Sequence, residues 1–229
     1  ITGIEYPDGS VTPFILRNEL KEIGYDTLEP QILNAADYGV PQRRNRIIFM
    51  GYRRGLNPPH YPKPTTKPEE RVTLLEAIGD LITDPEQRDK VNPNLSQYQL
   101  ESVNGRTPNI NGIPISATDI ANTELSRQTD IVRERFELFK PGESGSYLKK
   151  RVMEVGIDIS DKPALIDLCS KQLKISKSEV IELFKKPGAT KEQVEVLLTK
   201  KNIRQKWSPD QPSATVVTIA DDYISPWEP

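Results

Sequence analysis

The chain has 229 residues and a formal net charge of −2, with 35% apolar and 28% charged side chains. These values fit one large domain or two small ones and exclude a membrane protein, because no run of about 18 apolar residues occurs. One cysteine and one histidine exclude a disulfide framework and a Cys/His zinc site, and a Ser-His-Asp hydrolase would depend on His60 alone.

The first residues and the distribution of charge indicate the cell compartment and the kind of partner. Ile1 begins neither the charged nor the apolar segment of a signal peptide, so we expect the chain to start inside a longer protein of a reducing cytoplasm. Residues 38–68 carry seven basic side chains and no acidic one, and residues 161–206 carry eleven basic and six acidic ones. Two basic blocks in an acidic remainder permit a nucleic-acid partner, and the alternative is solvated surface charge.

The first quarter of the chain has an α/β pattern. Apolar spacing predicts a helix over about residues 13–23, ended by Gly24. Residues 25–33 are expected to be extended, and the apolar run 46–52 is typical of a strand buried in a parallel or mixed sheet. These elements amount to part of an α/β layer.

The next stretch contains many breakers of regular structure. Five prolines between residues 55 and 68 indicate a domain boundary. A helix is predicted over residues 73–81, where Thr73 and Glu76 have capping-box spacing. Asn-Pro, Asn-Gly and Gly-Ile-Pro signals in residues 84–116 predict turns between short strands.

This turn-rich stretch also carries side chains able to read base edges, namely Arg106, Asn109 and Asn111. Asparagines in loops more often serve the geometry of the turn itself. We therefore do not assign a reading role to these residues from sequence.

Helices dominate the later part of the chain. One is predicted over residues 124–139, ended by Pro141-Gly142, and three more begin within residues 161–201. Two of these three starts are capping boxes, Ser176/Glu179 and Thr190/Gln193. The lysines there either hold phosphates or cover a solvated insertion. The β-branched run 214–219 predicts a strand.

The most informative segment runs from Asn34 to Gly51 and contains Pro-Gln-Arg-Arg-Asn-Arg. In an extended chain, Gln42, Arg44 and Arg46 share one face, while Arg43 and Asn45 share the other. Two guanidiniums beside an amide can hold phosphate oxygens and donate to a base carbonyl. The plain alternative is charge that protects the edge of an apolar strand.

The full string closely resembles the Gln-x-Arg-x-Arg motif of DNA cytosine-5 methyltransferases, including the preceding Ala-x-Asp-Tyr-Gly-Val-Pro. Members of that family flip the target cytosine out of the duplex. The resemblance implies that Arg44, Arg46 and Gln42 lie at the catalytic pocket beside the flipped cytosine. It places Arg43, Arg53 and Arg54 on the DNA.

A second segment, Pro-Ser-Ala-Thr-Val from residue 212, is similar to the Pro-Ser-x-Thr-Ile segment of the same family. There it supports the target-recognition domain and returns the chain to the catalytic domain. The resemblance implies that Ser213 and Thr215 contact DNA. Ser225 stands where the family usually has histidine, which leaves only local contacts in doubt.

Three motifs on which the family's reaction depends are not in this sequence: the Pro-Cys-Gln nucleophile, the Glu-Asn-Val glutamate, and the glycine-rich loop for S-adenosylmethionine. Cys169 lies in a predicted helix and is expected to be a small core residue. The resemblance therefore implies a fragment that is inactive alone, with S-adenosylmethionine bound by a missing N-terminal part.

From this resemblance we expect an α/β remnant of a Rossmann-like methyltransferase domain and a mixed α+β target-recognition domain. Residues 1–55 would belong to the catalytic domain, residues 56–203 to target recognition with a helical insertion, and residues 204–229 to the returning segment. The whole enzyme would methylate C5 of cytosine in a specific DNA sequence.

Two other classes of function stay open. The chain could be a non-catalytic DNA-binding module or the specificity half of a split methyltransferase, or an interaction protein with chance motifs. The expected partners are double-stranded DNA and a cognate restriction endonuclease. We expect no membrane contact, a monomer, and a cytoplasm of bacterial or phage origin.

Overall fold

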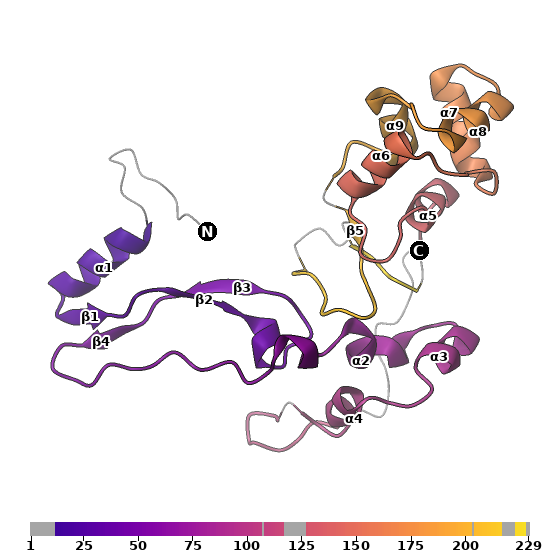
Figure 1. Ribbon diagram of the computed structural model, residues 1–229. Helices are drawn as coiled ribbons and strands as arrows, with labels where there is room; N and C mark the ends of the chain where they lie inside the picture. The colour runs from indigo at the N-terminus through magenta and orange to yellow at the C-terminus, as the bar shows by residue number, and fades with distance from the viewer. Residues whose placement is uncertain (1–11, 107, 117–126, 203, 217–222, 228–229) are drawn as a thin grey trace. The chain divides into compact units, whose positions relative to one another are not determined.

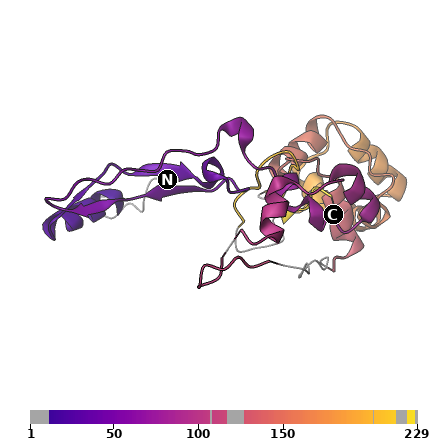
Figure 2. The same cartoon turned by 90° about the horizontal axis from the view of Figure 1, so that it is seen from below.

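The computed structural model describes residues 12–106, 108–116, 127–202, 204–216 and 223–227. The chain divides into two compact units, residues 1–72 and 73–229 (Figures 1 and 2). Within the described residues, no helix has the length and apolar character needed to cross a membrane.

The described part of the first unit, residues 12–72, contains one α-helix and two pairs of antiparallel strands. Helix α1 spans Thr12–Glu22, close to the predicted range. Strand β1 (Tyr25–Thr27) pairs with β4 (Gly51–Arg53), and β2 (Gln31–Asn34) pairs with β3 (Asn45–Ile48). Figure 1 shows these pairs as a narrow ribbon. The extended prediction for residues 25–33 is confirmed in its main part.

The sequence-based expectation for the apolar run 46–52 was wrong in its sheet type. The run forms parts of β3 and β4, which pair antiparallel in two-stranded sheets, and no side chain of either strand is buried. An apolar run is buried on both faces only where layers cover both faces. Among residues 12–72 of this unit, α1 packs against β1, and β3 pairs only with β2.

The proline-rich segment runs alongside β2 and β3. Tyr61 Oη donates to the Ile48 carbonyl at 2.9 Å, and Tyr38 Oη donates to the Pro62 carbonyl at 3.0 Å. The segment is therefore part of the first unit, and the units divide after Val72. The limits expected after residues 55 and 203 stay predictions about functional parts.

The second unit opens with three short helices, α2 (Leu74–Ile78), α3 (Pro85–Val91) and α4 (Gln97–Val103). The 3₁₀ turns in the described residues are η1 (Ala35–Tyr38) and η2 (Pro68–Glu70) of the first unit and η3 (Gly79–Leu81) of the second. The capping box at Thr73 is confirmed.

The expectation of turns and short strands over residues 84–116 was wrong for most of the stretch. Asp84 caps α3 ahead of Pro85, and a capping box of Ser96 and Gln99 starts α4. These start signals outweigh the Asn-Pro turn signal between the two helices. An antiparallel bridge between Pro108 and Pro114 is the extended pairing described in this stretch.

A helical bundle follows, made of α5 (Asp130–Glu137), α6 (Gly145–Glu154), α7 (Pro163–Leu173), α8 (Lys177–Lys185) and α9 (Lys191–Leu198). The predicted helix 124–139 is confirmed over α5. It was wrong for residues 127–129, which are not helical and end at the N-cap Thr129, and residues 124–126 lie outside the described ones. The three predicted starts correspond to α7, α8 and α9, and both capping boxes are present. Helix α6 was not predicted.

The bundle holds the main hydrophobic core of the second unit. Eight side chains of this core have 0% exposed surface: Leu148, Val152, Ile159, Leu165, Cys169, Val180, Phe184 and Leu197. Contacts of α9 with α6 and α7, and of α7 with α5 and α8, close this core. The lysine-rich segment is thus a packed structure with its charges on the outside.

Helices α6 to α9 leave and rejoin the rest of the unit at one place, which we call the neck (residues 142–145 and 204–206). Gly142 N–H donates to the Lys206 carbonyl at 2.9 Å, and Gly145 N–H donates to the Arg204 carbonyl at 2.7 Å. A side chain at Gly145 would lie only 3.0 Å from the Lys201 carbonyl oxygen, so the close approach favours glycine.

The last two strands of the described residues lie at the neck. Strand β5 (Gln205–Lys206) pairs in parallel with β6 (Tyr223–Ile224), and Trp207 N–H donates to the Ile224 carbonyl at 3.0 Å. The strand predicted over 214–219 is not present in residues 214–216, and residues 217–219 lie outside the described ones.

Candidate functional site

The Gln-x-Arg-x-Arg segment is held by one asparagine. Asn34, the last residue of β2, accepts hydrogen bonds at its Oδ1 from Ala36 N–H at 3.3 Å and from Arg44 N–H at 3.1 Å. Ala35 N–H in turn donates to the Arg44 carbonyl at 3.0 Å. Asn34 therefore fixes both the start of η1 and the backbone of Arg44. We call residues 34–46 the arginine arm.

The proline-rich segment supports the arm from the side. The Asp37 carbonyl accepts from Thr65 N–H and Thr66 N–H, each at 3.0 Å. The Asp37 carboxylate pairs with Arg71, whose Nε lies 2.9 Å from Oδ1, and both side chains are about three-quarters buried. Such a partly buried charge-assisted pair resists solvent screening better than an exposed one.

The three predicted pocket residues, Gln42, Arg44 and Arg46, differ in how far the structure exposes their side chains. Gln42 and Arg44 are half-buried, Arg43 and Asn45 are exposed, and Arg46 is exposed as well. Exposure therefore alternates from Gln42 to Asn45, as expected for side chains on opposite faces of an extended chain. The alternation ends at Arg46. Arg46 lies opposite Leu33 in the strand pair, and its guanidinium donates to the Asn45 carbonyl at 2.9 Å.

Of the predicted DNA contacts, Arg43 lies in the arm. The others lie outside it. Arg53 and Arg54 are exposed at the end of β4, where Arg54 pairs with Asp26 at 3.6 Å. In the second unit, Ser213 is 7% exposed and Thr215 is half-buried. The burial of Ser213 leaves DNA little surface to contact there.

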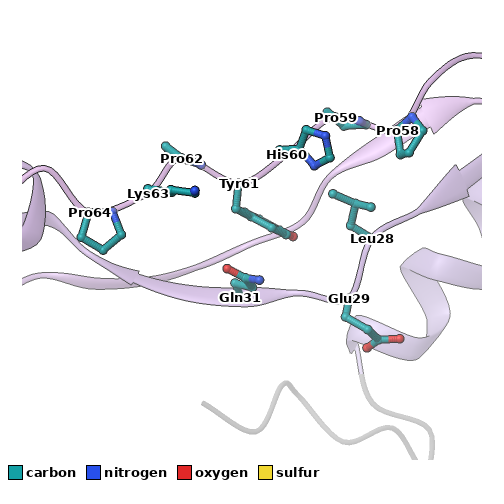
Figure 3. Close-up of a pocket in the computed structure, with 10 residues that line it drawn as sticks. All are labelled: Leu28, Glu29, Gln31, Pro58, Pro59, His60, Tyr61, Pro62, Lys63 and Pro64. Atoms are coloured by element: carbon teal, nitrogen blue, oxygen red, sulfur yellow. The ribbon is translucent and has the colours of Figure 1, made fainter.

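A groove in the first unit was not predicted from the sequence. It has a volume of about 580 Å³ and is lined by β2-side residues and by the proline-rich segment, including Gln31, His60, Tyr61 and Lys63. Figure 3 shows Tyr61 directed from the proline-rich segment toward the strands. The spacing of the prolines was the available signal, but it indicates an extended chain and not what that chain packs against.

Cys169 is fully buried in α7, as expected for a core residue. Burial raises the pKa of its thiol to about 11, because the thiolate loses its hydration there. A thiol in this state is a poor nucleophile. Within the described residues, no group of three side chains is arranged to hold a metal ion.

A family model for C-5 cytosine-specific DNA methylase matches residues 7–221 of the chain. The chain belongs to this family. The resemblance seen in the sequence is confirmed, and the fold of this family member combines helices with small sheets. No solved structure matches the chain.

Curated relatives are Type II methyltransferases. The chain is 49% identical over 73 residues to M.XorII of Xanthomonas oryzae, which covers 28% of the chain and 16% of the relative. It is 46% identical over 95 residues to M.MthTI of Methanothermobacter thermautotrophicus, covering 41% and 26%. It is 31% identical over 139 residues to M.DdeI of Desulfomicrobium norvegicum, covering 59% and 32%. These matches span at most a third of each relative.

Proposed function

We propose that this chain supplies the arginine arm and the target-recognition part of a DNA cytosine-5 methyltransferase. The whole enzyme would transfer a methyl group from S-adenosylmethionine to C5 of cytosine in a specific duplex sequence. The observation that carries the proposal is the fixed backbone of Arg44 on the arm, in a chain of this family.

The arm suits an anionic partner. Among the described residues, no carboxylate pairs with the guanidinium of Arg44 or of Arg46. Each guanidinium keeps donors for phosphate oxygens or for a base carbonyl. Because Asn34 positions Arg44 before any ligand binds, less conformational entropy is lost on binding.

The parts of the enzyme are assigned by this proposal and not by the compact units. Residues 1–55 would belong to a Rossmann-like catalytic domain, residues 56–203 to target recognition, and residues 204–229 to the return into the catalytic domain. Double-stranded DNA is the proposed partner, and the Type II names of the relatives make a cognate restriction endonuclease a second one.

S-adenosylmethionine is the cofactor that the family implies, and the described residues do not fit it. Strands β1 to β6 lead into no glycine-rich turn that could receive a nucleoside. We derive no step through the cofactor for this chain.

The 229 residues alone are expected to transfer no methyl group to DNA. Their single cysteine is Cys169, whose raised pKa and complete burial keep it from attacking a base. Purified chain, duplex DNA and S-adenosylmethionine with a labelled methyl group make the assay. Incorporated label above the level of a sample without protein would contradict this proposal.

Binding to duplex DNA tests the role of the arm. Arg44→Ala combined with Arg46→Ala is expected to weaken binding about tenfold at low salt, because two phosphate-binding cations are lost. The slope of log K against log salt should become shallower by up to about 2, at about 0.9 per phosphate contact. Fluorescence anisotropy of a labelled duplex measures both quantities.

Arg133→Ala is the matched control. Arg133 is an exposed arginine of α5 and pairs with Asp130 at 3.3 Å. Its substitution removes one positive charge and leaves the arm unchanged. Its binding should stay within about twofold of the wild type. The single variant Arg44→Ala removes the same charge as Arg133→Ala and is expected to weaken binding more. Equal losses in these two single variants would mean that total charge, and not the arm, holds the DNA.

A further inference from the structure

The segment after α4 doubles back on itself (Figure 1). Pro108 and Pro114 form an antiparallel bridge, and Asn109 N–H donates to the Ile113 carbonyl at 2.8 Å. We call residues 108–114 the hairpin tip. Two chain segments joined by such a bridge resemble a short piece of the two-stranded β-ribbon that the major groove of B-DNA admits.

The hairpin tip is rigid before it meets a partner. Asn109 Oδ1 accepts from Asn111 N–H at 2.9 Å and from Ile113 N–H at 3.0 Å. Gly112 adopts φ +75°, which glycine reaches without strain, and its N–H donates to the Asn109 carbonyl at 2.9 Å. The side chain of Asn109 therefore serves the turn and is not available to a ligand.

Arg106 is also occupied within the chain. Its guanidinium donates to the Tyr98 carbonyl at 2.7 Å, pairs with Glu101 at 3.0 Å, and lies 3.3 Å from the centre of the Tyr98 ring. Of the three residues considered as base readers from the sequence, only Asn111 has an exposed side chain for which the described residues provide no partner.

The chemistry at the tip matches one base pair in particular. Ile110 is completely exposed, at 101% of its reference surface, and Asn111 follows it directly. In the major groove an A·T pair presents adenine N6 and N7, which an asparagine amide can bind together, beside the thymine methyl, which an aliphatic side chain contacts. No acidic residue occurs from Ser102 to Thr118, so no carboxylate of this stretch repels phosphates.

We infer that the hairpin tip enters the major groove of duplex DNA, where Asn111 reads an adenine and Ile110 contacts a thymine methyl group. This inference rests on the proposed function and goes further, since it names residues that determine sequence specificity. It assigns the exposed apolar surface of the tip to base edges and not to another protein.

Selection from a library of duplexes with a randomised central segment tests the inference. Immobilised wild-type chain is expected to enrich a sequence with at least one fixed A·T pair. Asn111→Ala should lower the preference for one A·T pair by about tenfold while keeping affinity for unselected duplex within about twofold. Ile110→Ala should weaken the preference for thymine at the same or a neighbouring pair.

The control is Asn94→Ala, which removes an exposed asparagine between α3 and α4. Asn94→Ala should enrich the same DNA sequence as the wild-type chain. Enrichment of one identical sequence by the wild type and Asn111→Ala, or of no sequence by the wild type, would overturn the inference. If the wild type bound no duplex at any salt concentration, the proposed function would fail as well, so the two failures are distinguishable.

Discussion

Phe184→Ala is expected to lower the free energy of unfolding of the second unit by about 3–5 kcal/mol. Phe184 lies in α8 with 0% of its surface exposed, inside the core formed with α7 and α9. Removing its ring costs the transfer free energy of the buried carbons and leaves a cavity. Because domains of this size are stable by only about 5–15 kcal/mol, the loss should bring the unit close to unfolding at 37 °C.

Urea unfolding followed by circular dichroism measures this change. Tyr147→Ala is the matched control, since it also removes an aromatic ring from a bundle helix but from a side chain that is 71% exposed. It should cost less than about 1 kcal/mol. If Phe184→Ala cost no more than Tyr147→Ala, the result would contradict the burial of Phe184 in the core.

Cys169 is expected to react with iodoacetamide at pH 8 at least about a hundredfold more slowly in the folded chain than in the chain unfolded in urea. Burial raises the pKa of the thiol from 9.0 to about 11, and two pKa units reduce the thiolate fraction by about a hundredfold. The buried sulfur is also out of reach of the reagent until the core opens. Mass spectrometry of quenched samples gives both rates.

The same shift has a consequence for stability at high pH. The folded chain holds the thiol proton more tightly than the unfolded chain, so this contribution to stability is complete below about pH 9. It is lost progressively as the pH rises toward 11. The free energy of unfolding should therefore fall more steeply over this range in the wild type than in Cys169→Ala. Equal alkylation rates in folded and unfolded chain would contradict the burial of the thiol.

Helix starts were the most predictable part of the fold, because a capping box is written in residues three positions apart. Thr73, Ser176 and Thr190 each mark such a start. Ser96 has the same spacing to Gln99, but an Asn-Pro pair stands just before it. Because Asn-Pro is typical of turns, the sequence predicted turns there and not a helix. Ser144 caps α6 with Tyr147 at the third position, where no acidic or amide side chain completes the box.

The strands and the site were predictable only in part. The apolar run after Arg46 indicates an extended segment, but its partner strand depends on which distant backbone it meets. The motif predicts Arg44 and Arg46 as site residues from residue types alone. The hydrogen bond from Arg44 to Asn34 joins residues ten positions apart through a 3₁₀ turn, and no local pattern encodes that contact.

The neck also bears on how such a protein can change over generations. A segment whose two ends meet at paired backbone positions can be lengthened, deleted or exchanged for another without altering the course of the chain on either side. Helices α6 to α9 meet this condition, and the face of α5 that packs on α7 is the surface that would need to adjust. Recombination at the neck can therefore replace these four helices in one event and leave the arginine arm untouched.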